Sequence, residues 1–154
     1  MNSVGSVALA AEKEAVAIYR RLSAEQPGRY QPELAGALNN LGAVLRHLRR
    51  YEDALAAQQD AVDLYRQLAA QPGRYQPDLA HALRNLGTTL HNLGRYEEEL
   101  AKYQESLTLM TAAARDQPRY GAEAMALDRL IRTCLIQLGR EEESIKYGLS
   151  PPHP

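Results

Sequence analysis

Phe and Trp are absent from this 154-residue chain, and nine Tyr are its only aromatic residues. Because sheets favour large aromatic and β-branched side chains, a β-rich core is disfavoured. The single cysteine, Cys134, cannot close an internal disulfide, which fits a reducing cytoplasm, and we expect a cytoplasmic protein. Apolar runs are too short to span a bilayer, so we do not expect a membrane protein.

Neither sign of charge dominates, since 18 Lys and Arg face 19 Asp and Glu. A nucleic-acid-binding domain usually has a basic excess, so we expect no nucleic-acid partner. The abundant residues are instead Ala, Leu, Glu, Gln and Arg, which all favour helices. The composition therefore predicts an all-α chain of one domain.

A repeat of about 45 residues organises the chain. Residues 27–32, which read PGRYQP, return as residues 72–77 and more weakly as 118–120. Residues 8–20 parallel residues 54–66, so the first helix is the second half of a repeat. We therefore expect a single domain made of a half repeat, two full repeats, a degenerate capping repeat and a flexible tail, at 6–26, 27–71, 72–117, 118–148 and 149–154.

Each repeat has the pattern of two amphipathic helices, because its leucines recur at helical spacing. A proline followed by an acid, at Pro32 and Pro77, is typical of a first helical turn. Gly94 and Gly139 follow the first helix of their repeats, where a glycine in the left-handed conformation commonly caps the C-terminus of a helix. The apolar stretch 4–11 imitates a secretion signal but has no cation before it, so we expect it to be part of a helix of the mature protein. The predicted helices span 6–25, 33–48, 52–70, 78–93, 97–115, 122–138 and, shorter, 141–147.

The chain resembles the tetratricopeptide repeat (TPR) family in a motif that repeats from Leu38–Leu45 to Leu83–Leu90. The motif residues in the first repeat are Leu38, Leu41, Gly42, Leu45, Ala54 and Ala61. The usual repeat has ~34 residues, so this longer one is more similar to the TPRs of kinesin light chain and of sensor arrays behind bacterial STAND-type NTPases. The resemblance implies a right-handed superhelical solenoid of antiparallel helix pairs with about seven helices. Glycines inside helices at 42 and 87 predict close helix contacts.

The resemblance also implies a concave groove, lined by the first helix of each pair, that binds a protein or peptide segment. Asn40 and Asn85, just before the two Leu-Gly pairs, resemble a ladder that bonds the backbone of an extended peptide; alternatively, they bridge neighbouring helices. Because Arg84, Arg129 and the histidines make the groove mildly basic, we expect a neutral-to-acidic segment. The implied groove residues are Asn39, Asn40, His47, His81, Arg84, Asn85, Thr88, Asn92, Arg129 and Thr133.

Features of an enzyme are missing from the sequence. There is no phosphate-binding loop, nucleophile elbow or zinc-binding helix motif, so we expect no catalysis, no cofactor and no metal. His81 and His91 are spaced badly for chelation, and solvated or groove-lining histidines are favoured. The acids at 97–99 and 141–143 are interpreted as first-turn residues that favour the helix dipole. Cys134 is interpreted as a buried structural thiol.

Two alternatives to peptide binding stay open. The first helix lacks its repeat partner, so its apolar face at Val7, Leu9, Val16 and Tyr19 is a candidate for self-association as a homo-oligomer. The second alternative is that the chain is a sensor arm of a larger signalling protein. The carboxylate clamp of heat-shock co-chaperone TPRs does not carry over, because Asn39 and Ala126 stand where that clamp needs lysines.

Overall fold

The computed structural model describes residues 3–71 and 73–147, and the tail expected at 149–154 lies outside these residues. The described residues form α-helices and two short 3₁₀ segments, without a strand. The all-α prediction is therefore confirmed. The chain divides into two compact units, residues 1–75 and 76–154.

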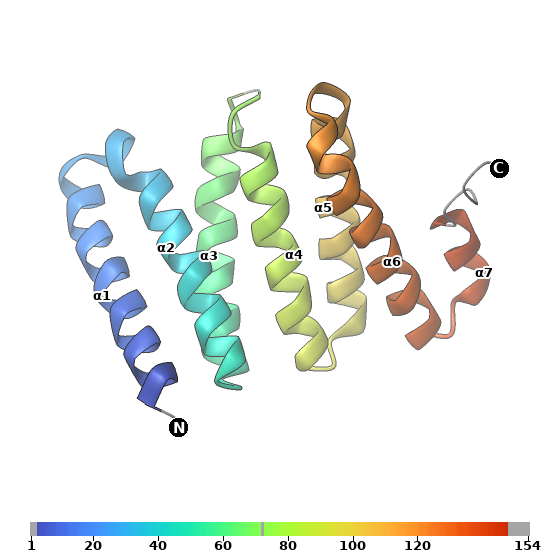
Figure 1. Cartoon of the computed structure of the whole chain (residues 1–154), viewed down its shortest axis with the longest axis horizontal. Helices are drawn as coiled ribbons and strands as arrows, with labels where there is room; N and C mark the ends of the chain where they lie inside the picture. Colours follow the sequence, from blue (N-terminus) through green and yellow to red (C-terminus); the bar gives the residue numbers. More distant parts are fainter. Residues whose placement is uncertain (1–2, 72, 148–154) are drawn as a thin grey trace. The chain divides into compact units, whose positions relative to one another are not determined.

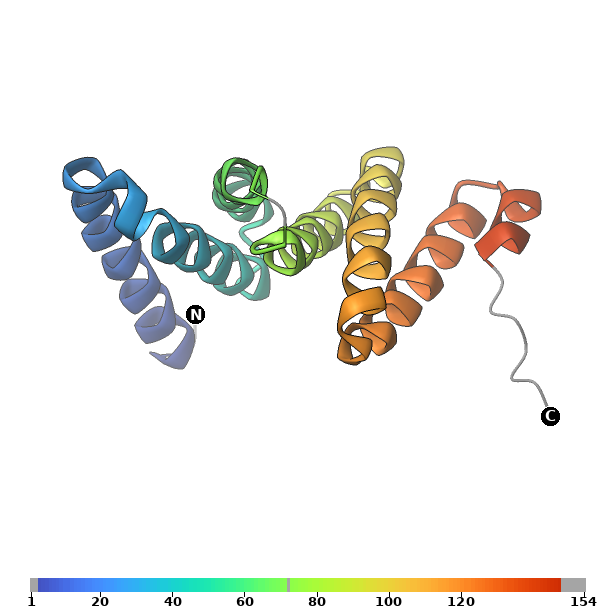
Figure 2. The same ribbon diagram turned by 90° about the horizontal axis from the view of Figure 1, so that it is seen from above.

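The first unit consists of α1 (Ser3–Glu25), α2 (Pro27–His47) and α3 (Tyr51–Ala69). Neighbouring helices run antiparallel, and α2 packs against both α1 and α3 (Figures 1 and 2). Burial of an apolar side chain contributes about 1.5–3 kcal/mol, so the leucine side of α2 supplies much of the stability of this unit. The core residues are Leu9, Val16, Leu34, Ala37, Leu38, Leu45, Ala54, Ala57 and Ala61.

The second unit begins with α4 (Gln76–Asn92) and α5 (Tyr96–Asp116), followed by η1 (Pro118–Tyr120) and α6 (Gly121–Gln137). α5 packs against both α4 and α6. The short helix expected at 141–147 is one α-turn, α7 (Glu141–Ser144), followed by the 3₁₀ segment η2 (Ile145–Tyr147). The core of this unit comprises Ala80, Leu100, Tyr103, Met110, Leu127, Ile131, Cys134 and Leu135.

One helix boundary differs clearly from the prediction. α2 begins at Pro27 rather than at residue 33, and Pro32 lies inside it. Pro27 suits the first helical position because its fixed φ is already helical. The Arg29 N–H donates to the carbonyl of the N-cap residue Gln26 at 3.1 Å, which closes the first turn of the helix. Pro32 is therefore not the start of this helix, contrary to the prediction.

The caps between paired helices agree with the prediction. Gly94 and Gly139 have φ values of 72° and 70°, in the left-handed region that glycine adopts without strain. Arg49 holds the equivalent place after α2 with a φ of 62°. The N–H after each of these residues donates to the carbonyl five positions back, as from Arg50 to Leu45 at 2.9 Å. The same cap thus forms with and without glycine.

The two helical glycines lie at close helix contacts, as predicted. A Cβ on Gly42 would lie 2.3 Å from Cγ of Gln58, and one on Gly87 would lie 2.6 Å from Cε1 of Tyr103. Both distances are shorter than van der Waals contact, so a larger residue forces the paired helices apart. Gln58 is fully buried, and its amide atoms have no hydrogen-bond partner in the described part of the chain.

Candidate functional site

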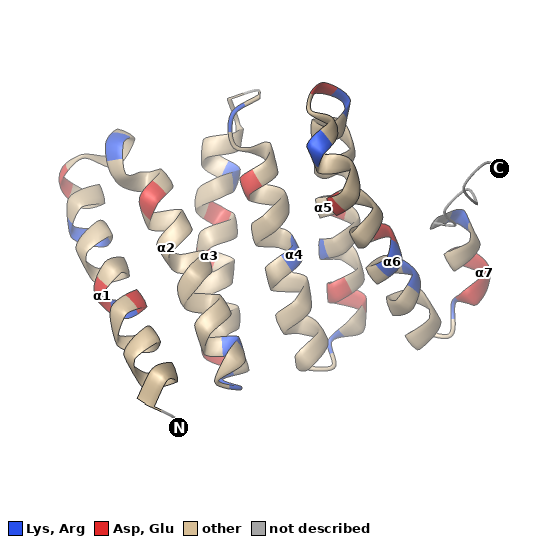
Figure 3. Cartoon of the chain, viewed as in Figure 1, with Lys and Arg blue, Asp and Glu red and all other residues tan. Residues whose placement is uncertain are grey.

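Most of the predicted site residues lie in the second unit, on the polar side of α4 and of α6. At 100° per residue, the polar residues of α4 lie opposite its buried leucines. Arg129 and Thr133 occupy the corresponding side of α6. Figure 3 shows acidic and basic positions along both helices. The site is therefore a charged polar surface, since the apolar residues of these helices face the core.

His81 joins α4 to α6 within this surface. Its Nε2 is hydrogen-bonded to a carboxylate oxygen of Glu123, in the first turn of α6. Asp78, in the first turn of α4, also acts on His81: burial raises the pKa of Asp78, and the charge of His81 partly lowers it. His81 is thus committed to contacts within the chain, which reduces its availability to a ligand.

Glu123 was not among the predicted site residues. An acid recurs at the 45-residue step, at Glu33, Asp78 and Glu123, and this recurrence was a signal available in the sequence. Its pairing with His81 was not available, because the two side chains come from helices 42 positions apart.

Arg84 and Arg129 are equivalent residues, one repeat apart, on α4 and α6. Arg84 is half-buried and Arg129 is exposed. Within residues 3–71 and 73–147, neither guanidinium forms an ion pair. A guanidinium carries five N–H donors in a planar fork, which matches carboxylates and peptide carbonyls. These two side chains are the available cationic donors of the surface.

The threonines of the surface are occupied by their own helices. The Thr88 hydroxyl donates to the Arg84 carbonyl at 3.1 Å and lies 3.2 Å from the Tyr103 hydroxyl. Thr133 donates to the Arg129 carbonyl at 3.1 Å. Their hydroxyl protons are therefore committed to these bonds.

The asparagines differ in exposure. Asn40 and Asn92 are exposed, whereas Asn39 and Asn85 are half-buried. Asn39 and Asn85 each interact with other groups of the chain. His47, at the end of α2, is exposed and bonds through Nδ1 to the Ala43 carbonyl at 2.8 Å. Asn39, Asn40 and His47 lie on α2, in the first unit.

A second polar cluster lies between α4, α5 and α6. Glu99 is only 3% exposed and accepts a hydrogen bond from His91 Nδ1 at 3.1 Å. Burial raises the pKa of Glu99, and the neighbouring His91 partly lowers it. Glu99 lies in the first turn of α5, as predicted, but tertiary packing also buries it, at the position where the preceding repeat has Ala54. His91 is partly exposed and also bonds to this acid, a contact that the sequence analysis did not predict.

Cys134 is fully buried beside this cluster, as predicted. Its thiol donates to the Tyr96 carbonyl at 3.3 Å. Burial, reinforced by the neighbouring Glu99, raises the pKa of the Cys134 thiol to about 12. Since the thiolate is the nucleophilic form, Cys134 is chemically quiet at neutral pH.

Among the described residues, no three His, Cys, Asp or Glu side chains gather in a way that would hold a metal ion. None of the described helices is long and apolar enough to cross a membrane.

Comparison with known protein families matches residues 33–112 to the tetratricopeptide repeat. The chain belongs to the TPR family. The match covers both helix pairs that carry the Leu-Gly motif, so the resemblance seen in the sequence is confirmed. TPR repeats generally act as non-catalytic scaffolds for protein–protein interaction.

Among solved structures, this TPR chain is similar to BtubC (BKLC) from P. vanneervenii, with a TM-score of 0.64 and 17% sequence identity. The similarity covers 95% of this chain and 55% of that one, so the chain spans about half the length of its structural relative. At this identity the likeness shows the fold, a helical TPR solenoid. Comparison with curated protein sequences gives no match.

Proposed function

We propose that this TPR chain is a scaffold that binds an extended, neutral-to-acidic protein segment along the polar side of α4 and α6. The observation that carries the proposal is the pair Arg84 and Arg129: equivalent positions of α4 and α6, accessible to solvent, without an ion pair to a described carboxylate. Two cationic forks on neighbouring first helices favour a ligand that offers carboxylates or carbonyls.

The asparagines contribute a second, sequence-independent part of the binding. Asn40 is exposed, and its amide both donates and accepts a hydrogen bond, as a peptide backbone requires. Asn85 is half-buried and already interacts within the chain, which favours the alternative role of joining helices for this residue. We therefore assign Asn40 mainly to the ligand and Asn85 to both roles.

The test is an array of acidic, neutral and basic peptides, followed by calorimetric titration of the peptides that bind. We expect Arg84→Ala and Arg129→Ala to weaken acidic peptides selectively, and more strongly at low salt. Asn40→Ala should weaken peptides that bind the first unit by about 0.5–1.5 kcal/mol, whatever their charge. Arg115→Ala, which removes an exposed arginine in the last turn of α5, is the matched control.

Two results would contradict the proposal. One is an array in which basic peptides bind as well as acidic ones. The other is unchanged affinity in both arginine variants. Melting curves run in parallel distinguish a structural asparagine from a binding one. If Asn85 is purely structural, Asn85→Ala lowers the melting temperature and leaves the affinity for peptides unchanged.

Self-association is a second candidate function, favoured by an exposed apolar row on α1. Val4 is 74% exposed, Val7 69% and Ile18 39%, and with Ala11 they recur at helical spacing. The face proposed from the sequence is corrected in part, because Leu9 and Val16 are buried against α2 and only Val7 is open. Sedimentation at several protein concentrations measures whether the chain self-associates, and Val7→Glu should disrupt the association. A wild-type chain that stays monomeric at all concentrations rejects this candidate.

A further inference from the structure

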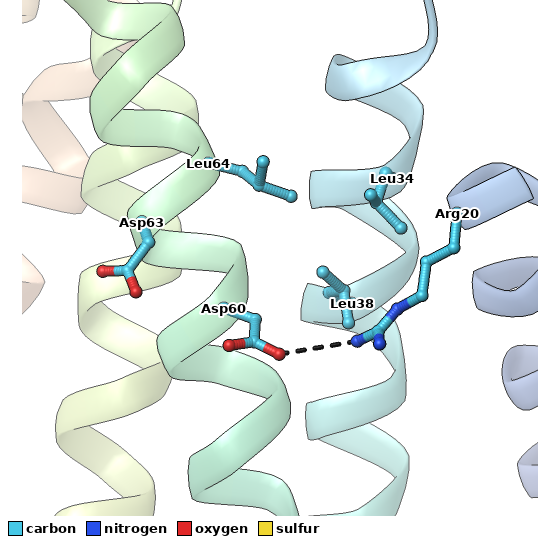
Figure 4. Close-up of a pocket in the computed structure, with 6 residues that line it drawn as sticks. All are labelled: Arg20, Leu34, Leu38, Asp60, Asp63 and Leu64. Carbon is cyan, nitrogen blue, oxygen red and sulfur yellow. Dashed lines mark hydrogen bonds and ion pairs between the residues drawn. The ribbon is translucent and has the colours of Figure 1, made fainter. Parts of the chain in front are cut away.

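A pocket of about 290 Å³ opens in the first unit between α1, α2 and α3 (Figure 4). Leu34 and Leu38 of α2, with Leu64 of α3, form an apolar floor. The rim is charged and carries Arg20 from α1 and Asp60 and Asp63 from α3. The pocket therefore combines an apolar base with an ionic mouth.

This pocket is separate from the proposed peptide surface. Its floor residues Leu34 and Leu38 belong to the leucine side of α2, whereas Asn39 and Asn40 lie on the opposite side of that helix. A ligand in the pocket thus contacts residues that a peptide on the polar face does not reach. A ligand bound in the pocket can therefore be distinguished from a bound peptide by which residues of the chain respond to it.

The charges of the rim favour a cation. Asp60 and Asp63 lie one turn apart on α3, and Arg20 lies across from Asp60 (Figure 4), so these three charged side chains of the rim sum to −1. Arg20 meets Asp60 at 3.5 Å, with both side chains more than half exposed. An ion pair so exposed contributes little to stability, so it is easily exchanged. Asp63 accepts a hydrogen bond from the neutral amide of Gln59 at 3.0 Å and keeps its charge available.

The shape of the pocket favours one long side chain. Its volume is at the lower end for ligand pockets, about 300–1,000 Å³, and is too small for a large ligand. Arginine combines an aliphatic stem, which packs on apolar surface, with a planar fork that contacts carboxylates. Arg20 itself extends from α1 to Asp60 at the mouth in this manner (Figure 4).

We propose that this pocket binds an arginine side chain of a partner protein, which lies on Leu34, Leu38 and Leu64 and replaces Arg20 at Asp60, while Asp63 adds negative charge to the rim. The partner thus engages the chain on the side of α2 away from the polar face. This second contact surface adds to the peptide site, and it does not depend on that site being occupied.

The test uses two acetylated dipeptide amides, leucyl-arginine and leucyl-citrulline, which differ in charge but hardly in shape. Each is titrated into the whole chain at low salt while backbone amide resonances are followed by NMR. We expect the arginine peptide to shift the resonances of Leu34, Leu38 and Leu64 saturably. Its dissociation constant should be at least threefold lower than that of the citrulline peptide, and added salt should reduce the ratio.

Variants at the rim make the proposal falsifiable. The double variant Asp60→Asn/Asp63→Asn should abolish the preference for arginine, whereas Arg20→Gln, which removes the internal competitor, should tighten arginine binding severalfold. Asp53→Asn, the same change two turns away on α3, is the matched control and should preserve the preference. Equal binding of the two peptides to the wild type overturns the proposal. So do pocket shifts that follow protein concentration alone, since the occupant is then a second copy of the chain.

Discussion

Gly87 determines how closely α4 approaches α5. A Cβ at this position would lie 2.6 Å from the ring of Tyr103, which is itself 2% exposed and held by the core. We expect Gly87→Ala to lower the free energy of unfolding by about 1–3 kcal/mol through overpacking. The gain of up to ~1 kcal/mol in helix propensity offsets only part of this loss. Urea unfolding at equilibrium measures the difference.

Gly28→Ala is the matched control for this substitution. Gly28 also lies in a helix, but a Cβ there meets no atom within 4 Å. Its replacement should leave stability unchanged or raise it by up to ~1 kcal/mol. A Gly87→Ala variant as stable as Gly28→Ala would show that the Tyr103 ring moves aside at little cost.

Glu99 makes stability depend on pH. Burial raises the pKa of this carboxyl above its ordinary value of 4.5, so the folded chain holds the proton more tightly than the unfolded chain. Its contribution to stability is complete below pH 4.5 and is lost as the pH rises through the raised pKa. The melting temperature of Glu99→Gln should therefore rise relative to that of the wild type as the pH increases from 4 to 7.

Exposed Glu142, in the first turn of α7, serves as the control for this prediction. Glu142→Gln removes a carboxyl from the surface of the same chain and is measured over the same range. If the Glu99→Gln difference is independent of pH, burial does not raise the pKa of Glu99 and its pairing with His91 dominates.

At the scale of the helices, the repeat predicted which elements form better than where each one begins. The same six residues, PGRYQP, open α2 as helix at 27–32, whereas Gly73 of the second copy has a φ of 88° and lies in a turn before α4. The third version, Pro118–Tyr120, is a 3₁₀ segment. The residues of these three short segments do not explain why their conformations differ. The start of α2 could therefore not be predicted from the local sequence.

A side-chain contact persists through these three backbones. The Arg29 guanidinium lies 5.3 Å from the centre of the Tyr30 ring. The equivalent distances are 5.5 Å for Arg74 over Tyr75 and 4.9 Å for Arg119 over Tyr120. Such cation–π contacts contribute about 0.5–1 kcal/mol at exposed sites. The recurring tyrosines thus pair with the preceding arginine, a contact that sequence adjacency could have suggested.

The end of α2 offers a stabilising substitution. Arg49 has a φ of 62°, where equivalent positions carry Gly94 and Gly139. Holding a side chain in this region costs about 1–2 kcal/mol, so Arg49→Gly should raise the free energy of unfolding by about 1 kcal/mol. The reciprocal Gly94→Ala should lower it by a similar amount. Denaturant unfolding of both variants checks the pair, and a loss of stability in Arg49→Gly would show that its side chain stabilises the cap in another way.

At the scale of the molecule, the periodic sequence was enough to predict the family and the helix pairs, because leucine spacing and Leu-Gly motifs recur locally. The site was predictable only as a surface. Which side chains remain available depends on contacts between helices, such as His81 with Glu123 and His91 with Glu99. Those contacts follow from tertiary packing, and no spacing within one helix encodes them.

Each compact unit has its own core, which leads to a prediction about cooperativity. In repeat proteins, stability is approximately a sum of unit and neighbour terms. Ile131 is fully buried in the core of the second unit, and Ile131→Ala should cost about 2–5 kcal/mol there. We expect amide hydrogen exchange to accelerate strongly over residues 76–147 and much less over residues 3–71. Leu45→Ala, buried in the first unit, should give the reverse pattern. Equal acceleration of both halves in either variant would mean that the two units unfold as one.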